Sequence, residues 1–437
     1  MKNKCGMLVK VCDYVLISLG LVMFFNLPHR IDSDGLERYM ALAELLTGGK
    51  VSNTKFSLIG PIFSTPLFFL GNFYQSARWW CERYNFVLFV LGLVCIHMLL
   101  FRKVDNAFLR QFIIILIFGS MFSQHQMDYF GEVFTAILVG VGMLAVTQGY
   151  VFSGWASIIL GVANTPATLV GLGFVVLALV LKYKKGRYIL ILGLTLAVIL
   201  LESWFRSGGI FSYSGNGGYA TFMPYSGRAG FSYPLFFGLL SILFSFGKGI
   251  FWFAPGLLLR VKKGLPGLSA AFRETYQLWI LFLVGLVLVY SKWWSWYGGW
   301  YWGPRFFLFA SIPASFALAA NLHDQERSAK LNLAILAILS WSLWVGLDGA
   351  VFGQNNMSVC IANDYKLEAL CWYVPEFGAL FRPFVDMGDK ILSIKTISFC
   401  LLYLIVFFRL ALPVFAQLWR VGIARLMELK QGFRLQF

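Results

Sequence analysis

The chain has 437 residues, of which 59% are hydrophobic and only 13% are charged, and its mean hydropathy is +0.72. A soluble domain is about 45–50% apolar and about 25% charged, so this composition excludes a soluble protein with a single anchor. The apolar residues form continuous runs, unlike the ~10-residue alternating segments of an outer-membrane barrel. The sequence therefore predicts an all-α polytopic membrane protein.

The net charge of +16 could indicate nucleic-acid binding, but the basic residues gather in short clusters between apolar runs. Cytoplasmic loops of membrane proteins carry an excess of Lys and Arg. With the N-terminus in the cytoplasm, all the clusters and both termini fall on that side. We therefore interpret the charge as topology and expect no nucleic-acid partner. The clusters are Lys2, Lys4 and Lys10; Arg102 and Lys103; Lys182, Lys184, Lys185 and Arg187; Arg260, Lys262 and Lys263; Arg327 and Lys330; and Arg409 through Arg434.

A membrane-spanning helix needs roughly 20 apolar residues, and run length with flanking charge predicts about 12 such helices. Segment 56–74 is also apolar, but counting it as a span would put Lys182 to Arg187 outside, so we expect an interfacial helix there. The predicted spans are 12–28, 85–101, 110–125, 132–149, 151–164, 166–182, 188–204, 248–261, 276–292, 305–321, 331–348 and 396–412.

Three long segments, about 29–84, 205–247 and 349–395, would then lie on the exterior face. We see no internal repeat and no soluble domain, so we expect one membrane domain over 1–437 whose function resides in these loops. Cys360 and Cys371 fall in the third loop and could form a disulfide there.

Acidic residues directly follow the first predicted span. Asp34 could act as a general base that takes a proton from an acceptor hydroxyl, and Asp32 is its close rival. The alternative is structural: Asp34 with Glu37 fits a capping box at the start of an amphipathic helix. The apolar face of that helix would carry Leu36, Tyr39, Met40 and Ala43.

Asp128 and Glu132 are four residues apart, which predicts one helix face at the exterior end of a span. There they could orient an acceptor, assist a base or hold a cation. The alternative is a helix cap at Asp128, with Glu132 favoured by the helix dipole. We expect the nearby His125 to be a capping or loop histidine.

Two cations stand out later in the chain. Lys248 lies between two glycines at a predicted helix start, where exposed backbone N–H groups could bind an anion; a snorkelling lysine is the alternative. Arg305 begins a span on the exterior side, against the positive-inside bias. Its guanidinium could hold a phosphate through two parallel hydrogen bonds, and an interfacial anchor is the alternative.

Residues 293–305 contain seven Trp or Tyr around Gly298-Gly299 and end in Gly303-Pro304-Arg305. An interfacial aromatic belt needs only a few rings. Flat rings, bare backbone and one cation form a surface suited to a ring-shaped, phosphate-bearing ligand.

With these motifs in this order, the chain resembles bacterial members of the GT-C superfamily of integral-membrane glycosyltransferases, in the mannosyl/arabinosyl-type branch. The resemblance covers most of the chain, and Gly-Pro-Arg after the aromatic-Gly-Gly run is its most specific motif. The other motifs are Asp32-Ser33-Asp34, Gly60-Pro61 with Pro66, Gly131-Glu132, and Gly247-Lys248-Gly249 with Pro255.

The resemblance implies a polyprenyl-phosphate sugar donor, used on the periplasmic or exterior face of a bacterial inner membrane in an inverting single displacement. Asp34, or Asp32, would be the base. Asp128 and Glu132 would position the acceptor, and Lys248 and Arg305 would bind the donor phosphate. The sugar or prenyl group would stack on Trp296, Tyr297, Trp300 and Tyr301. A divalent metal is possible, but no set of ligands in the sequence supports one.

Two other functions stay open, a glycan ligase or polymerase with a similar exterior site, and a lipid or solute transporter. A transporter often has charged or broken helices near the bilayer midplane and inverted repeats. The predicted spans hold almost no midplane charge, which favours a one-sided enzyme. We therefore expect Asp34, Glu132, Lys248 and Arg305 to line one exterior cavity.

Overall fold

The structure is a computed structural model that describes residues 2–208, 223, 230–261, 269–324, 327–353, 357–362, 365–386 and 393–434. Within these residues the regular secondary structure is helical, apart from one isolated bridge between Arg30 and Asp128. In this described part of the chain, seven helices are long and apolar enough to cross a membrane, and five shorter apolar helices of 10–17 residues accompany them. The chain is therefore an all-α, multi-pass membrane protein, as the composition predicted.

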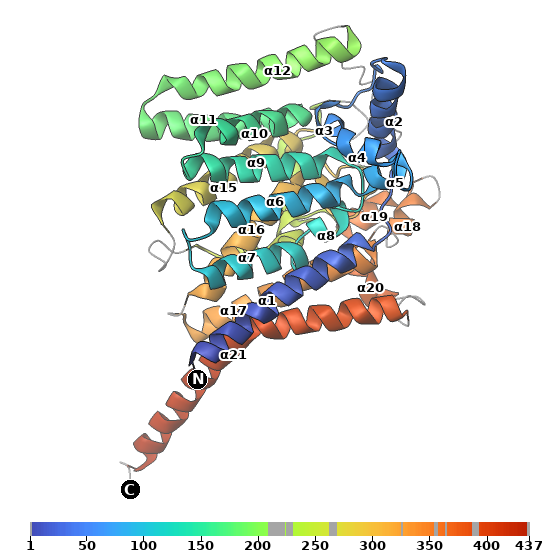
Figure 1. Cartoon of the computed structure of the whole chain (residues 1–437). Coiled ribbons are helices and arrows are strands. Elements are labelled where there is room, and N and C mark those ends of the chain that lie inside the picture. Colours follow the sequence, from blue (N-terminus) through green and yellow to red (C-terminus); the bar gives the residue numbers. More distant parts are fainter. Residues whose placement is uncertain are drawn as a thin grey trace.

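The helices pack side by side in one bundle (Figure 1). The seven long segments contain α1 (Lys2–Phe25), α11 (Leu169–Tyr183), α12 (Ile189–Ser207), α15 (Ala270–Ser291), α16 (Ser311–His323), α17 (Ala329–Val351) and α21 (Ile394–Arg434). The shorter apolar helices are α6 (Tyr84–Leu100), α7 (Asn106–Phe118), α9 (Gly131–Thr147), α10 (Val151–Asn164) and α13 (Leu235–Phe244).

Short helices from two of the predicted exterior segments gather at one end of the bundle, on the right in Figure 1. The turn between α11 and α12, which carries the basic cluster around Lys184, lies at the opposite end. The gathered helices are α2 (Ser33–Gly48), α3 (Ile59–Ile62), α4 (Thr65–Leu70), α5 (Ala77–Glu82), α18 (Ser358–Ile361), α19 (Glu368–Tyr373) and α20 (Arg382–Val385). The candidate site lies at this end.

Some predicted boundaries are wrong. The span expected at 248–261 consists of α14 (Ile250–Phe253) and the 3-10 turn η3 (Pro255–Leu258), because a proline within a helix removes a backbone hydrogen bond. The apolar helix α13 lies instead in the segment expected to be the second exterior loop. Much of that loop, 209–222 and 224–229, lies outside the described residues, as do Lys262 and Lys263.

The interfacial helix expected at 56–74 is also interrupted. It forms the two short helices α3 and α4, and Pro66 lies in the first turn of α4, where a missing N–H costs nothing. Gly60 in α3 donates its backbone N–H to Asn164 Oδ1 at 3.1 Å, which ties this segment to the end of α10. The segment therefore packs on the helical bundle.

Buried contacts fix the frame beneath the site. On α1, the fully buried Asp13 lies 2.8 Å from Arg110 on α7 and 2.8 Å from Arg409 on α21, so its charge is paired within the apolar bundle. The α9 and α10 backbones approach closely, because a Cβ on Gly142 would lie 2.8 Å from the carbonyl oxygen of Gly154. The loops at the end that holds the candidate site are connected to these packed helices.

Candidate functional site

The aromatic stretch folds back on itself between α15 and η4 (Arg305–Ala310). Gly298, Gly299 and Gly303 have φ of 71°, 80° and 68°. This left-handed conformation is readily adopted only by glycine, so the glycines of the Gly-Gly and Gly-Pro-Arg motifs allow these turns. The turns place Arg305 at the start of the next helical segment.

Arg305 is buried where three elements meet. Its Nη2 donates a 2.8 Å hydrogen bond to Asp34 in the first turn of α2, and its Nε lies 3.7 Å from Glu132 in the first turn of α9. Nε and Nη1 are buried and make no hydrogen bond within the described part of the chain. Three aromatic rings surround the guanidinium at 5.0–5.3 Å, those of Tyr301, Phe130 and Phe306. The structure thus brings Asp34, Glu132 and Arg305 together.

The environment of Asp34 favours its ionised form. Burial alone would raise the pKa of this carboxyl, but the positive charges of Arg305, Arg38 and Lys55 oppose burial and hold the pKa below its ordinary value. The residue at the N-cap of α2 is Asp32, which makes no side-chain capping bond. The capping-box alternative for Asp34 is therefore wrong.

Arg38 is a member of the cluster that we did not predict. It lies one turn after Asp34 on α2, is buried, and donates from Nη1 to the carbonyl oxygen of Ser57 at 3.3 Å. A Cβ on Gly131 would lie 2.9 Å from its Cζ, so this glycine makes room for the guanidinium. Burial lowers the pKa of Arg38, while the charges of Glu132 and Asp34 act in the opposite direction.

The buried face of α2 differs from the expected one. Leu36 and Met40, two of the predicted apolar contacts, are exposed. The helix directs Arg38 inward because Asp34 and Glu132 provide negative charge there. The spacing of Asp34 and Arg38, four residues apart, was the signal that could have revealed this face. The buried residues of α2 are Gly35, Arg38, Ala41 and Leu42.

Asp128 belongs to a neighbouring ion cluster. It is buried, accepts a 2.5 Å hydrogen bond from Arg30 Nε, and precedes α9, whose N-cap is Phe130. Both expectations for Asp128 are therefore wrong, because it neither caps α9 nor shares a helix face with Glu132. Burial raises the pKa of Asp128, and the charge of Arg30 opposes this shift. Arg30 also lies 3.4 Å from Asp32.

Tyr301 links the two clusters. Its hydroxyl donates to Asp32 at 3.4 Å, and its ring faces the guanidinium of Arg305. Asp32 is more accessible than Asp34, with side-chain exposures of 47% and 28%. Both candidate bases therefore lie close to the aromatic loop, but only Asp34 pairs directly with Arg305.

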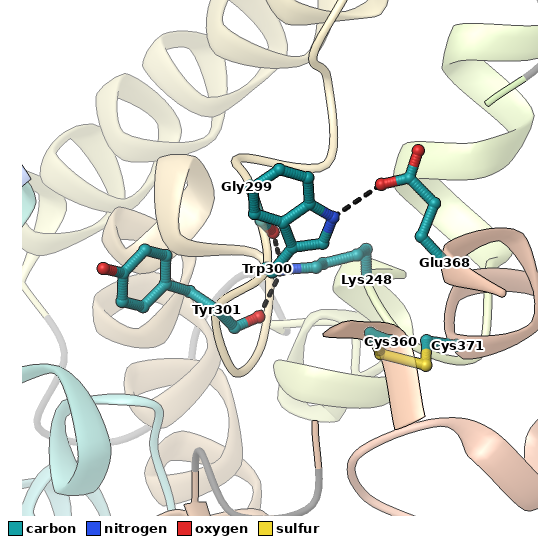
Figure 2. Close-up of a disulfide and its surroundings, with 7 residues drawn as sticks. All are labelled: Lys248, Gly299, Trp300, Tyr301, Cys360, Glu368 and Cys371. Atoms are coloured by element: carbon teal, nitrogen blue, oxygen red, sulfur yellow. Dashed lines mark hydrogen bonds between the residues drawn. A yellow bond between two sulfur atoms is a disulfide. The ribbon is translucent and has the colours of Figure 1, made fainter. Parts of the chain in front are cut away.

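Lys248 is buried, with its ammonium inside the turn of the aromatic loop (Figure 2). Nζ donates to the carbonyl oxygens of Gly299 at 3.1 Å, Gly303 at 2.9 Å and Tyr301. A lysine has three N–H donors, so the loop engages all of them. Burial lowers the pKa of Lys248 well below its ordinary value, and the charge of Arg305 adds to this shift. Lys248 therefore holds the loop and adds its charge near Arg305.

The four predicted platform rings differ in accessibility. Trp296 and Tyr297 are buried, and Tyr297 stacks on Trp372 with 5.5 Å between ring centroids. Trp300 and Tyr301 are half-buried. The first two rings thus pack inside the protein, and the second two have accessible surface.

His125 lies beneath the aromatic loop at the end of α8 (Phe122–His125) and is buried rather than placed in an open loop. Its Nε2 has no hydrogen-bond partner among the described residues and would lie 3.9 Å from a Cβ on Gly303. Burial, with the charges of Lys248 and Arg305, lowers the pKa of His125 to about 3. The ring is therefore neutral at physiological pH.

A polar groove of about 420 Å³ lies along α2 near Asp34. Its walls include Glu37 and Ala41, which follow Asp34 by three and seven residues and so lie on the same side of the helix. Lys55, 3.2 Å from Glu37, closes the opposite wall together with Ser52, Asn53 and Thr54.

Two further expectations concern cysteines and metals. Cys360 and Cys371 form a disulfide, which was one of the possibilities for the third exterior loop. Among the described residues there is no group of three or more His, Cys, Asp or Glu side chains that could hold a metal ion.

Two solved structures are similar to the chain. ArnT from Cupriavidus metallidurans in the apo state is similar with a TM-score of 0.50 and 14% identity, over 96% of this chain and 78% of that one. The same protein bound to undecaprenyl phosphate gives a TM-score of 0.47 and 13% identity, over 96% and 79%. No protein-family model and no curated protein matches the chain. At such low identity the likeness concerns the fold alone, and the chain has an ArnT-like fold.

Proposed function

We propose that the protein is a membrane glycosyltransferase that moves a sugar from a polyprenyl-phosphate donor to a lipid-linked glycan or another cell-envelope acceptor. The observation that carries this proposal is the 2.8 Å pair between Asp34 and Arg305, in which two buried nitrogens of Arg305 make no hydrogen bond to any residue that the structure describes. A buried guanidinium with unused donors suits a phosphate. The carboxylate beside it suits an acceptor hydroxyl.

The proposed reaction is a single displacement with inversion. The acceptor oxygen attacks the anomeric carbon while the bond from that carbon to the phosphate oxygen breaks. The electron pair leaves with the polyprenyl phosphate, and Asp34 takes the hydroxyl proton. Arg305 stabilises the negative charge that grows on the leaving phosphate. One carboxylate is enough, whereas a glycoside hydrolase uses two.

The ion pair would also make the basicity of Asp34 depend on whether the donor is bound. Pairing with Arg305 lowers the pKa of Asp34 and so weakens it as a base before the donor binds. A phosphate bound to Arg305 would neutralise part of the guanidinium charge, and the proton affinity of Asp34 would then rise. Asp34 would therefore be the stronger base when the donor is present.

The remaining predicted residues would act around this pair. Lys248 would add positive potential for the donor phosphate while it holds the loop. Asp128 and Glu132 would position the acceptor, which would arrive along the groove beside α2. Of the four predicted rings, Trp300 and Tyr301 have accessible surface and would form the platform for the sugar or prenyl group, whereas Trp296 and Tyr297 are buried and would support the loop.

We place this site on the periplasmic or exterior face of a bacterial plasma membrane, with both termini in the cytoplasm and the chain as one domain. The Cys360–Cys371 disulfide supports this orientation, because disulfides persist in oxidising compartments. The basic turn between α11 and α12 lies at the opposite end of the bundle, which agrees with the positive-inside bias (Figure 1).

The proposal is tested with purified protein in liposomes, supplied with radiolabelled polyprenyl-phosphate sugars and lipid-linked acceptors. We expect label in the acceptor fraction, and no label with Asp34→Asn. An arm with EDTA tests the need for a metal. Transfer of a whole glycan would identify a ligase or polymerase instead. Movement of the intact labelled lipid across the bilayer, without transfer, would identify a transporter.

A further inference from the structure

A disulfide-bonded segment contacts two parts of the proposed donor site, the aromatic loop and the turn that carries Lys248. We define the disulfide segment as residues 357–362 and 365–373, closed by Cys360–Cys371. It lies against the aromatic loop, 292–304, and against the turn that carries Lys248 (Figure 2). None of the motifs in the sequence assigns this segment a role.

Glu368 is its link to the aromatic loop. It is fully buried, and its Oε2 accepts a 2.6 Å hydrogen bond from Nε1 of Trp300. Oε1 accepts a 3.2 Å hydrogen bond from the backbone N–H of Met223. The ring of Tyr365 stacks on that of Trp300, with 3.7 Å between the ring centroids. Hydrogen bonds to a buried carboxylate are stronger than neutral ones, so this contact fixes the indole.

Trp372 is its link to the Lys248 turn. Its carbonyl oxygen accepts a 3.1 Å hydrogen bond from Gly247, and Nζ of Lys248 lies 4.6 Å from the centroid of its ring. A Cβ on Gly247 would lie 2.0 Å from the carbonyl oxygen of Cys371, so the turn rests directly on the disulfide-bonded backbone. The segment thus contacts the lysine and the loop that the lysine binds.

We propose that Glu368, held in place by the Cys360–Cys371 disulfide, is a positioning residue for the donor site. It fixes Trp300, and with it the carbonyl oxygens of Gly299, Tyr301 and Gly303 that surround Lys248. Reduction of the disulfide would release Glu368 and loosen the loop that leads to Arg305. The effect on donor binding rests on the proposed function, whereas the effect on the loop does not.

Hydrogen–deuterium exchange over 297–303 tests the structural half in the full-length protein. We expect exchange to become about 10-fold faster in Glu368→Ala and in reduced wild type, as for the loss of one hydrogen bond to a charged group. Glu368→Gln, which keeps an acceptor oxygen for Trp300, should restore part of the protection. Glu376→Gln, in η6 (Pro375–Phe377) beside the segment, is the matched control and should match wild type.

The double variant Cys360→Ser/Cys371→Ser separates the disulfide from the other cysteines of the chain, of which Cys12, Cys81, Cys95 and Cys400 are free in the part that the structure describes. It should resemble reduced wild type and should respond no further to reductant. Unchanged exchange over 297–303 in both reduced wild type and Glu368→Ala would overturn the inference, even if one of the variants folds poorly.

Kinetics test the functional half. Glu368→Ala should raise the KM for the donor by about 5- to 10-fold and leave kcat within about twofold, because a positioning residue does not touch the reacting atoms. Trp300→Phe lacks the N–H donor and should likewise raise the donor KM with little change in kcat. The donor KM of the double variant should be no higher than that of either single variant. An equal fall of kcat in all three would contradict a positioning role. If wild type transfers no sugar but its loop responds to reduction, the proposed function fails and the positioning inference stands.

Discussion

The carboxylate of Asp34 accepts a 2.8 Å hydrogen bond from the guanidinium of Arg305, although 271 positions separate the two residues in the sequence. The pair joins the first turn of α2 to the first turn of η4, so it connects the segment after α1 to the end of the aromatic loop. Because each group sets the electrostatic environment of the other, a change at one should be measurable at the other.

Asp34→Asn should lower the turnover of saturating donor by about 10²- to 10⁴-fold, the usual effect of losing a general base. The amide has nearly the same shape as the carboxylate but cannot accept the proton. Arg305 would lose its ion-pair partner, while Glu132 would still lie nearby at 3.7 Å. We therefore expect the variant to fold and insert, as measured by its yield and its elution as a single species in detergent.

Asp32→Asn is the matched control, since Asp32 is half exposed and lies outside direct contact with Arg305. It should retain most of the turnover. If Asp32→Asn is inactive and Asp34→Asn is active, the base is Asp32.

Arg305→Gln should raise the donor KM by about 10- to 100-fold, as expected when hydrogen bonds to a charged group are lost. Glutamine can still donate one hydrogen bond to Asp34 but carries no charge for the phosphate. Arg382→Gln, at the same end of the molecule but paired with Asp386, should leave the donor KM unchanged. Donor binding that is equal in Arg305→Gln and wild type would rule out the phosphate role.

The pH dependence of kcat/KM should reflect the ionisation of Asp34 and the effect of the Arg305 charge on it. Asp34 must be deprotonated to act as a base, so activity falls as the pH drops through its pKa. In wild type the charge of Arg305 holds that pKa below the ordinary value. In Arg305→Gln burial remains and the charge is gone, so the acid limb should move to higher pH. An acid limb at the same pH in both proteins would mean that another group controls it.

Gly131→Ala should lower the free energy of unfolding by about 1–3 kcal/mol, the typical cost of overpacking. The new Cβ would lie 2.9 Å from the guanidinium of Arg38 and 2.9 Å from Nδ2 of Asn164. Gly173→Ala on α11 is the control, because nothing lies within 4 Å of a Cβ there. In detergent, the thermal unfolding midpoint of Gly131→Ala should be lower than that of wild type, and the midpoint of Gly173→Ala should equal or exceed that of wild type.

Much of the architecture follows from the sequence because apolar run length and basic clusters are local signals. They predict an all-α membrane protein without any knowledge of its packing. The break at Pro255 and the interruption near Pro66 were misjudged because apolar content alone does not show where a helix ends. Hydrophobicity therefore locates apolar segments better than it locates helix boundaries.

The site was only partly predictable. Asp34 and Arg305 stand out because each charge lies near the exterior end of a predicted span, where contact with lipid would be costly. Arg38 was signalled only by its spacing of four residues from Asp34. Glu368 and the Arg30–Asp128 pair depend on partners far away in the chain, so no local pattern reveals them. The three carbonyl oxygens around Lys248 were equally hidden, because backbone acceptors have no sequence signature.

His125 should make the protein less stable in mild acid. Its pKa is lowered to about 3 in the folded chain, from an ordinary value of 6.5. Between these values the unfolded chain binds a proton that the folded chain does not, so this residue's contribution to the free energy of unfolding falls as the pH drops from 6.5 toward 3, by up to about 1.4 kcal/mol per pH unit.

His125→Gln should therefore shrink the difference between the thermal unfolding midpoints at pH 7 and pH 5. His29, whose pKa is lowered to about 4, acts in the same direction, so His29→Gln is the companion variant and the double variant should shrink the difference further. A midpoint difference that stays at the wild-type value in His125→Gln would show that the buried ring does not control acid stability.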